Sequence, residues 1–111
     1  MHAARKTDIS ESGQQAGPVA FHGRITVENA VEVRTILREA LWAKRANVCV
    51  DLSDVSYIDT SGVATLMEAA RIARRKGQKL VLTGLHDQPR YLLETTHLDH
   101  LFLMGDQEGG A

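Results

Sequence analysis

The 111-residue sequence has little of several features that mark common protein classes. It contains a single cysteine, Cys49, so no disulfide can form within the chain, which fits a reducing cytosol. No apolar run is long enough to span a membrane, and no signal-peptide pattern opens the chain. The net charge is only −1, which excludes the basic balance typical of nucleic-acid-binding domains. We therefore expect a cytoplasmic protein with no nucleic-acid partner and no direct membrane insertion.

What the sequence does contain suffices for one small domain. Apolar residues make up 43% of the chain and charged residues 24%, which is typical of a single core with a soluble surface. Residues 1–17 are polar and lack periodicity, which predicts a flexible N-terminal tail, with an irregular strand around Lys6–Ser10 as the alternative. The Gly-rich residues 105–111 predict a C-terminal tail. The folded domain is expected to cover residues 18–104.

Strand and helix patterns alternate along this domain, which predicts the α/β class. Apolar residues recur at helical spacing in Val27–Lys44, where Thr26 is the expected N-cap, and again in Val63–Ala73. The second helix should turn Met67 toward the core and stop at Gly77. The expected strands are Val19–Gly23, Val48–Leu52, Leu80–Thr83 and a short edge strand at Leu101–Leu103.

The strand Val48–Leu52 carries little polarity, so we expect helices on both of its faces and Cys49 as a buried core residue. A polar turn at Ser53–Asp54 should end this strand. The segment that connects it to Leu80–Thr83 is too long for a hairpin, so we expect the two strands to be parallel and joined by a helix. Asp87 is the expected N-cap of a later short helix.

The tetrapeptide Asp59-Thr60-Ser61-Gly62 lies where the second helix begins, beyond the carboxyl end of a strand. A helix start offers unpaired N–H groups and a partial positive charge, and it therefore favours anions such as a phosphate. Each of the first three residues is also an ordinary N-cap. The same tetrapeptide surrounds the carboxylates of aspartic proteases, but those enzymes need two carboxylates that share a proton. The residues alone leave a cap and a phosphate site open and weigh against a protease.

The flanks of the tetrapeptide, Val50–Leu66, resemble the signature of the STAS family, the anti-sigma-factor antagonists. In that signature an apolar strand ends in Asp-Leu-Ser, and a short apolar turn leads to Asp-Ser/Thr-Ser-Gly and a helix. The resemblance continues through Arg74–Leu82 and Arg90–Phe102 and covers about Val19–Leu103. It implies a small mixed β-sheet flanked by α-helices.

By this resemblance the chain is an anti-sigma-factor antagonist, a protein-binding module without enzymatic activity or cofactor. The unphosphorylated form would bind an anti-sigma factor, often itself a serine kinase, and a phosphate on Ser61 would break that complex. Asp54 and Asp59 are expected to repel the phosphate. Thr26 stands where many family members carry an Asp. The residues that the resemblance places at the partner-binding surface are Asp59, Thr60, Ser61, Gly62 and Thr26.

Ser61 rather than Thr60 is the expected phosphoacceptor. Gly62 should leave room for a kinase to approach the Ser61 hydroxyl, whereas Thr60 is β-branched, stiffer and available as a cap. An alternative function is a cytosolic STAS subunit of an ABC lipid-transport system, with a permease or ATPase subunit as the partner. In that type the tetrapeptide often has Thr followed by a small residue, so Thr60 fits the transporter type and Ser61 the antagonist type.

The chain's histidines invite a metal hypothesis. His97 and His100 are close in sequence, and His86 precedes them. No third ligand has a spacing that the sequence fixes, and the single cysteine lies elsewhere. The sequence therefore predicts no metal site.

Overall fold

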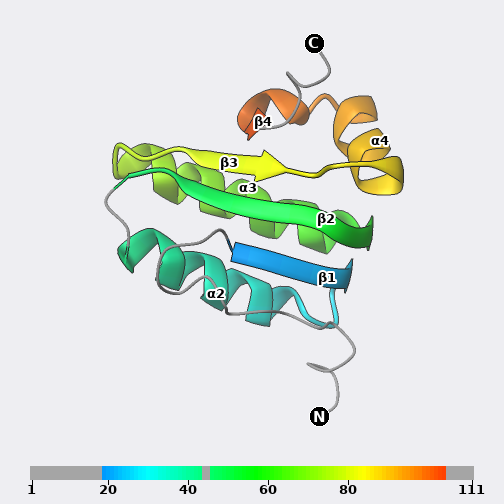
Figure 1. Cartoon of the computed structure of the whole chain (residues 1–111), viewed down its shortest axis with the longest axis horizontal. Helices are drawn as coiled ribbons and strands as arrows, with labels where there is room; N and C mark the ends of the chain where they lie inside the picture. Colours follow the sequence, from blue (N-terminus) through cyan, green and yellow to red (C-terminus); the bar gives the residue numbers. More distant parts are fainter. Residues whose placement is uncertain (1–18, 44–45, 105–111) are drawn as a thin grey trace.

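A computed structural model describes residues 19–43 and 46–104 of the chain, which form one parallel sheet with helices packed against it (Figure 1). The sheet order is β1-β2-β3-β4, and each neighbouring pair is parallel. This confirms the α/β class, but the expected mixture of strand directions is not found among the described strands. The predicted tails, 1–17 and 105–111, lie outside the described residues. The elements are β1 (Val19–Ile25), α2 (Ala30–Ala43), β2 (Val48–Ile58), α3 (Thr60–Arg75), β3 (Leu80–Thr83), α4 (Asp87–Thr95), the 3-10 turn η2 (Asp99–Leu101) and β4 (Leu103–Met104).

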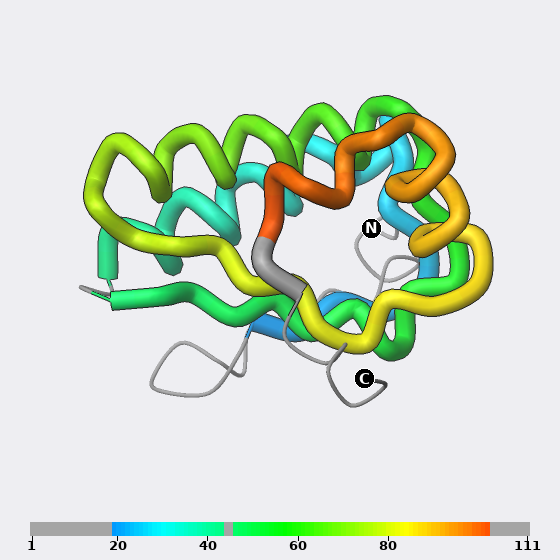
Figure 2. Tube along the Cα trace, turned by 90° about the horizontal axis from the view of Figure 1, so that it is seen from above, coloured from blue at the N-terminus to red at the C-terminus, as the bar shows by residue number. Residues whose placement is uncertain are grey.

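The core lies between the sheet and helices α2 and α3, which cover the same face of the sheet (Figure 2). The predicted apolar stripes point into it. The α2 side chains that reach the core are Val33, Leu37 and Leu41, and Ile36 and Ala40 pack beside them. On α3, Leu66 and Ala69 are buried, while Met67 is only partly buried. Burial of a leucine side chain of this kind contributes about 2 kcal/mol, so these stripes hold the helices on the sheet.

Strand β2 is longer than expected and is covered on one face only. The predicted turn at Ser53–Asp54 is wrong, because β2 continues to Ile58, with irregularities in its register against β1 at Ser53 and Ser56. Its partner β1 explains the continuation: the pairing runs on from His22 opposite Asp54 to Ile25 opposite Ile58. Tertiary strand pairing has thus overridden the turn propensity of Ser and Asp.

The expectation that helices cover both faces of the central strand is also wrong. Burial alternates along β2, with Val48, Val50 and Leu52 buried and Cys49 exposed. Cys49 is therefore not a core residue. The helices α2 and α3 take the face of the sheet that Val48 and Val50 point toward, which leaves Cys49 on the other face.

Helix α2 begins at Ala30, three residues after the predicted start at Val27, so Thr26 is not its N-cap. Residues 26–29 form a hydrogen-bonded turn instead, in which the Asn29 N–H donates to the Thr26 carbonyl at 3.0 Å. The Asn29 side chain closes this turn from both sides, since its Oδ1 accepts from the Thr26 N–H at 2.9 Å and its Nδ2 donates to the Arg24 carbonyl at 2.7 Å. Asn29 is almost fully buried, so its amide secures the junction between β1 and α2.

Of the other predicted element boundaries, one is confirmed and two are wrong. Helix α3 stops before Gly77, as predicted, and Gly77 has the left-handed φ of 74° that favours glycine. Its end is closed by hydrogen bonds from Gly77 N to Arg74 O at 3.1 Å and from Gln78 N to Ala73 O at 2.8 Å. Asp87 is not the N-cap of α4, because the helix begins at Asp87 itself and the cap position is His86. The strand expected at Leu101–Leu103 is displaced to β4 by the turn η2.

The register of α3 can be tested by placing a charge at successive positions. Leu66→Asp buries an uncompensated carboxyl and should lower the free energy of unfolding by about 4 kcal/mol or more. Met67→Asp, at a partly buried position, should cost less, and Ala64→Asp, on the exposed face, should change stability by about 0.5 kcal/mol or less. Urea denaturation of the three variants provides the measurement, and any other rank order contradicts the register.

Candidate functional site

The site is built where β2 ends and α3 begins, and Asp59 holds it together. One carboxylate oxygen of Asp59, Oδ1, accepts from the Gly62 N–H at 2.9 Å and so caps α3. The other, Oδ2, accepts from the Val27 N–H at 3.1 Å, in the turn that follows β1. The Asp59 N–H donates to the Ile25 carbonyl at 3.1 Å. Asp59 therefore ties the first turn of α3 to the connection between β1 and α2.

Thr60 and Ser61 are the first two residues of α3, and neither of them is its cap. Thr60 is exposed and Ser61 is half-buried. The Thr65 hydroxyl donates to the Ser61 carbonyl at 3.0 Å, so this bond involves the backbone of Ser61 and not its hydroxyl. Among the described residues, no group hydrogen-bonds the Ser61 or Thr60 hydroxyl. Both hydroxyls thus lie at the positive end of a helix without an internal partner.

Gly62 is buried, and its missing side chain serves the packing of α3 on the sheet. A Cβ atom at this position would lie 2.7 Å from the Ile25 carbonyl oxygen and 2.7 Å from the Ile58 Cγ2. Real Cβ atoms do not approach backbone oxygen so closely, so only glycine lets α3 begin this near to β1 and β2. The expectation that Gly62 makes room for a kinase is therefore wrong, because the space faces the sheet.

The structure brings Thr26 to the same junction. Its neighbours Ile25 and Val27 are the two residues whose backbone groups bond Asp59. The Thr26 hydroxyl accepts from the Glu28 N–H at 3.2 Å, within the turn. The Thr26 hydroxyl is thus engaged in a hydrogen bond within its own turn, and it caps this turn rather than the helix α2. Thr26 still lies near the tetrapeptide, because both of its neighbours bond Asp59.

Sequence reasoning missed Gln88, which fixes the end of β2. Its side-chain amide pairs with the backbone of Ile58 in both directions: Oε1 accepts from the Ile58 N–H at 2.9 Å and Nε2 donates to the Ile58 carbonyl at 3.0 Å. Strand β3 pairs with β2 only as far as Thr83 opposite Asp51, so this amide replaces a strand beyond that point. A lone glutamine in a short helix carries no sequence signal for such a role.

Two apolar side chains beside the site were also not anticipated as part of it. Val27 is 68% exposed and Val31 is 69% exposed. Val27 is the residue whose N–H bonds Asp59, and Val31 lies one turn further along the chain, in the first turn of α2. Val27 therefore brings exposed apolar surface to the junction that Asp59 makes at the start of α3.

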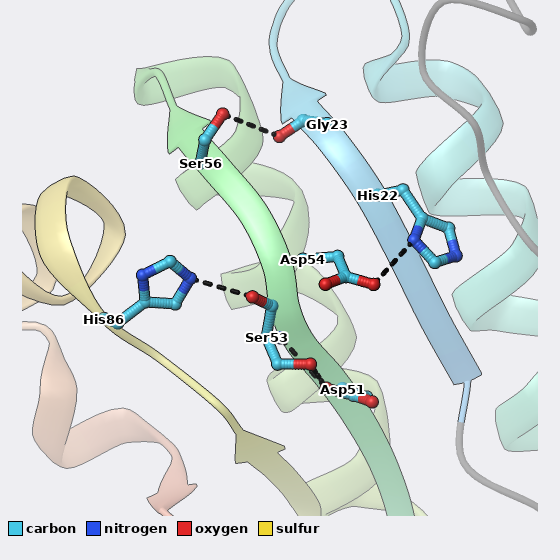
Figure 3. A network of polar contacts seen from close by, with 7 residues as sticks. All are labelled: His22, Gly23, Asp51, Ser53, Asp54, Ser56 and His86. Atoms are coloured by element: carbon cyan, nitrogen blue, oxygen red, sulfur yellow. Dashed lines mark hydrogen bonds and ion pairs between the residues drawn. The ribbon is translucent and has the colours of Figure 1, made fainter.

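The charge around Ser61 is less negative than the sequence suggested. Asp54 lies five residues before Asp59 on an extended strand, which places it roughly 16 Å away. There its Oδ2 pairs with His22 Nδ1 at 3.0 Å (Figure 3). The expectation that Asp54 repels a phosphate on Ser61 is therefore wrong, and Asp59 remains as the nearby carboxylate.

Figure 3 also shows a second polar contact between β2 and the loop after β3. His86 Nε2 lies 2.9 Å from the Ser53 carbonyl oxygen. The other ring nitrogen of His86, Nδ1, lies 3.0 Å from Asp87 Oδ2. The hydrogen bond to the Asp87 carboxylate, aided by the Ser53 carbonyl, raises the pKa of His86 above its ordinary value of 6.5. The protonated imidazole donates to both oxygens at once.

Within residues 19–43 and 46–104, no group of three or more His, Cys, Asp or Glu side chains is arranged to hold a metal ion. His86 takes part in the contacts to Ser53 and Asp87 instead. In the same part of the chain, no helix has both the length and the apolar content that a membrane span requires.

Comparison with known proteins places these features in a family. The family model described as "Mlab, STAS domain" matches residues 10–105. An anti-sigma-B factor antagonist of Listeria monocytogenes is 30% identical over 94 residues, which cover 85% of this chain and 77% of that protein. The intermembrane phospholipid transport system binding protein MlaB of Escherichia coli is 36% identical over 53 residues, 43% of this chain and 55% of MlaB.

The fold also matches a solved structure. The crystal structure of a putative anti-sigma factor antagonist from Thermotoga maritima superposes with a TM-score of 0.70 over 94% of this chain and 89% of that one. The sequence identity is 18%, so this likeness concerns the fold alone.

The packing role of Gly62 leads to a stability prediction. Gly62→Ala forces the Ile25 carbonyl and the Ile58 side chain apart and should lower the free energy of unfolding by about 2 kcal/mol. Ala64→Gly, on the exposed face of the same helix, serves as the control for helix propensity and should cost about 1 kcal/mol. Chemical denaturation compares the variants. A Gly62→Ala protein as stable as wild type would contradict the close approach.

The contacts of His86 lead to a pH prediction. Because its folded-state pKa lies above the unfolded value, His86 stabilises the fold fully below pH 6.5 and loses this contribution as the pH rises through the folded pKa. The gain is small, since the His86 side chain is 41% exposed and the pair is screened. NMR titration should give a midpoint above 6.5. Asp87→Asn should lower that midpoint, and it suits the left-handed φ of 47° as Asp does. An unchanged midpoint in Asp87→Asn would show that the carboxylate is not the cause.

Proposed function

This chain belongs to the STAS domain family, and we propose that it is a phosphorylation-switched anti-sigma-factor antagonist of the cytoplasm. The observation that carries the proposal is the Ser61 hydroxyl, which lies at the start of α3 without a hydrogen bond to the described residues. The exposed Val27 lies at the same junction, since its N–H bonds Asp59. An anti-sigma factor that is also a serine kinase would dock on this surface. Asp59, Thr60 and Thr26 frame it, and Gly62 shapes it from beneath.

A phosphate on Ser61 is expected to change partner binding rather than the fold. A phosphate carries about −1.5 to −2 charges at neutral pH. The helix start and its N–H groups partly compensate this charge, while Asp59 opposes it. Because Ser61 makes no side-chain bond that holds the fold, its modification would leave the junction intact. The same charge near the exposed Val27 would disfavour an apolar contact with the partner, and the partner would dissociate.

STAS domains generally act as binding modules rather than as catalysts, and the proposal involves no cofactor. The carboxylate of Asp59 is committed to the backbone N–H groups of Val27 and Gly62. It is therefore a structural cap and not a free general base for chemistry on the Ser61 hydroxyl.

A second candidate function is a STAS subunit of an ABC lipid-transport system, with a permease or ATPase subunit as partner. Two observations favour it: the similarity to E. coli MlaB and the exposure of Thr60 at the first position of α3. In this case the same surface would form a lasting contact through Thr60, and no kinase would act on it. Capture of partners from a lysate of the source organism, identified by mass spectrometry, separates a kinase from an ATPase.

The phosphoacceptor assignment can be tested with three proteins. Wild type, Ser61→Ala and Thr60→Val are incubated with the captured or neighbouring kinase and ATP, and the phosphate is located by mass spectrometry. Wild type and Thr60→Val should be labelled at Ser61, and Ser61→Ala should remain unlabelled but folded. Ser61→Asp adds about one negative charge and should weaken partner binding.

Two outcomes would oppose the assignment. If Ser61→Ala is labelled as strongly as wild type, Ser61 is not the acceptor. If the captured partner is an ATPase or permease and no protein is labelled, the transporter-subunit function replaces the antagonist function.

A further inference from the structure

Helices α2 and α3 line a groove on the outer surface, which runs from Ala64, just after the tetrapeptide, to the far end of α3. Its volume is about 640 Å³, and its walls come from the second half of α2 and from most of the length of α3, from Ala64 to Lys76 at its end. From α2, Arg38 and Trp42 line it, one turn apart. From α3, Arg71 and Arg75 face them, with Ile72 as an apolar wall. The groove thus combines an aromatic ring and apolar surface with guanidinium groups.

The groove is strongly basic although the chain as a whole has a net charge of −1. Four cationic side chains line it, those of Arg38, Arg71, Arg75 and Lys76, against a single carboxylate, that of Glu68. That carboxylate is already paired, since Glu68 Oε1 lies 3.2 Å from Arg34 Nε. The positive charge of the lining is therefore not neutralised from within.

Compensation of the helix dipole explains only part of this arrangement. Basic side chains at the end of α3, such as Arg75 and Lys76, match the negative helix terminus. Arg38 lies in the middle third of α2, where the dipole favours no charge. Trp42 is 69% exposed and contacts Lys76, whose Nζ lies 4.1 Å from the ring centroid. An exposed tryptophan between guanidinium groups is typical of a binding surface, where Trp and Arg are enriched.

We propose that this groove binds an acidic segment of a partner protein. Its carboxylates would pair with the guanidinium groups of Arg38, Arg71 and Arg75, which suit carboxylates through bidentate hydrogen bonds. An apolar side chain of the segment would pack between Trp42 and Ile72. The concave shape favours a peptide chain over a lipid bilayer, because a flat membrane surface cannot enter a hollow between two helices.

This site is separate from the one proposed for phosphorylation. The groove wall reaches back to Ala64, but the first arginine that α3 contributes is Arg71, ten residues beyond Ser61 and about 15 Å along the helix axis at 1.5 Å per residue. A partner seated on the Ser61 surface would leave the groove open. The groove is therefore a second docking surface, and it stands whether the first partner is an anti-sigma factor or a transporter subunit.

The test uses Trp42, the only tryptophan of the chain, as its own reporter. The full-length protein is titrated at physiological salt with a synthetic peptide of glutamates that carries leucine at every fourth position. Trp42 fluorescence should change saturably, and a peptide with Gln in place of Glu should bind at least about tenfold more weakly. Ser61→Asp should bind the acidic peptide as wild type does, which separates this site from the proposed switch.

Matched charge reversals on one helix provide the control. Arg71→Glu with Arg75→Glu should weaken binding by about tenfold or more. Arg74→Glu reverses a charge at the same helix end but outside the groove, and should change the affinity by about twofold or less. Circular dichroism verifies that each variant is folded. Three results would overturn the proposal: no fluorescence change with the acidic peptide, equal weakening by Arg74→Glu, or binding of phosphatidylglycerol vesicles but not of the peptide.

Discussion

The carboxylate of Asp59 is the constraint on which the site depends. Its two oxygens bond the backbone of Gly62 in α3 and of Val27 after β1, and its own N–H bonds Ile25. Three chain segments therefore meet at one residue, and each bond satisfies a backbone group that a helix start or a strand end leaves open. Because Asp59 caps α3, the hydroxyls of Thr60 and Ser61 are not needed to cap it.

Gly62 and Gln88 complete what Asp59 begins. The glycine lets α3 approach the backbone of Ile25, and the glutamine amide pairs with Ile58 where β3 no longer reaches β2. The end of β2 is thus held by β1 on one side and by α4 on the other. A rigid frame of this kind keeps the start of α3 in place whatever is attached to Ser61, so a modification there changes the surface rather than the fold.

The apolar stripes and ends of the helices could be predicted from the sequence, whereas the features that depend on how strands pair in the sheet could not. The stripe of Leu37 and Leu41 and the stop at Gly77 follow from local spacing and conformation, and the structure confirms both. The continuation of β2 through Ser53–Asp54 depends on β1, which lies about thirty residues away in sequence. The exposure of Cys49 depends on which face of the sheet the helices cover. The residues of β2 alone do not show whether helices cover one face or both. For the tetrapeptide, local spacing predicted that a helix begins there, but not that Asp59 rather than Thr60 caps it.

The two ends of α3 present opposite chemistry, and this follows from the helix itself. At its start the unpaired N–H groups and the positive end of the dipole face Ser61, where an anion is stabilised. At its end Arg75 and Lys76 match the negative terminus, and the parallel helix α2 adds Arg38 and Trp42 beside them. A chain with almost no net charge thereby keeps a strongly basic surface toward one end of α3, whose arginines begin about 15 Å along the helix from the proposed phosphoacceptor Ser61. If both proposals hold, this separation would let one small domain hold two partners, with a phosphate that acts on only one of them.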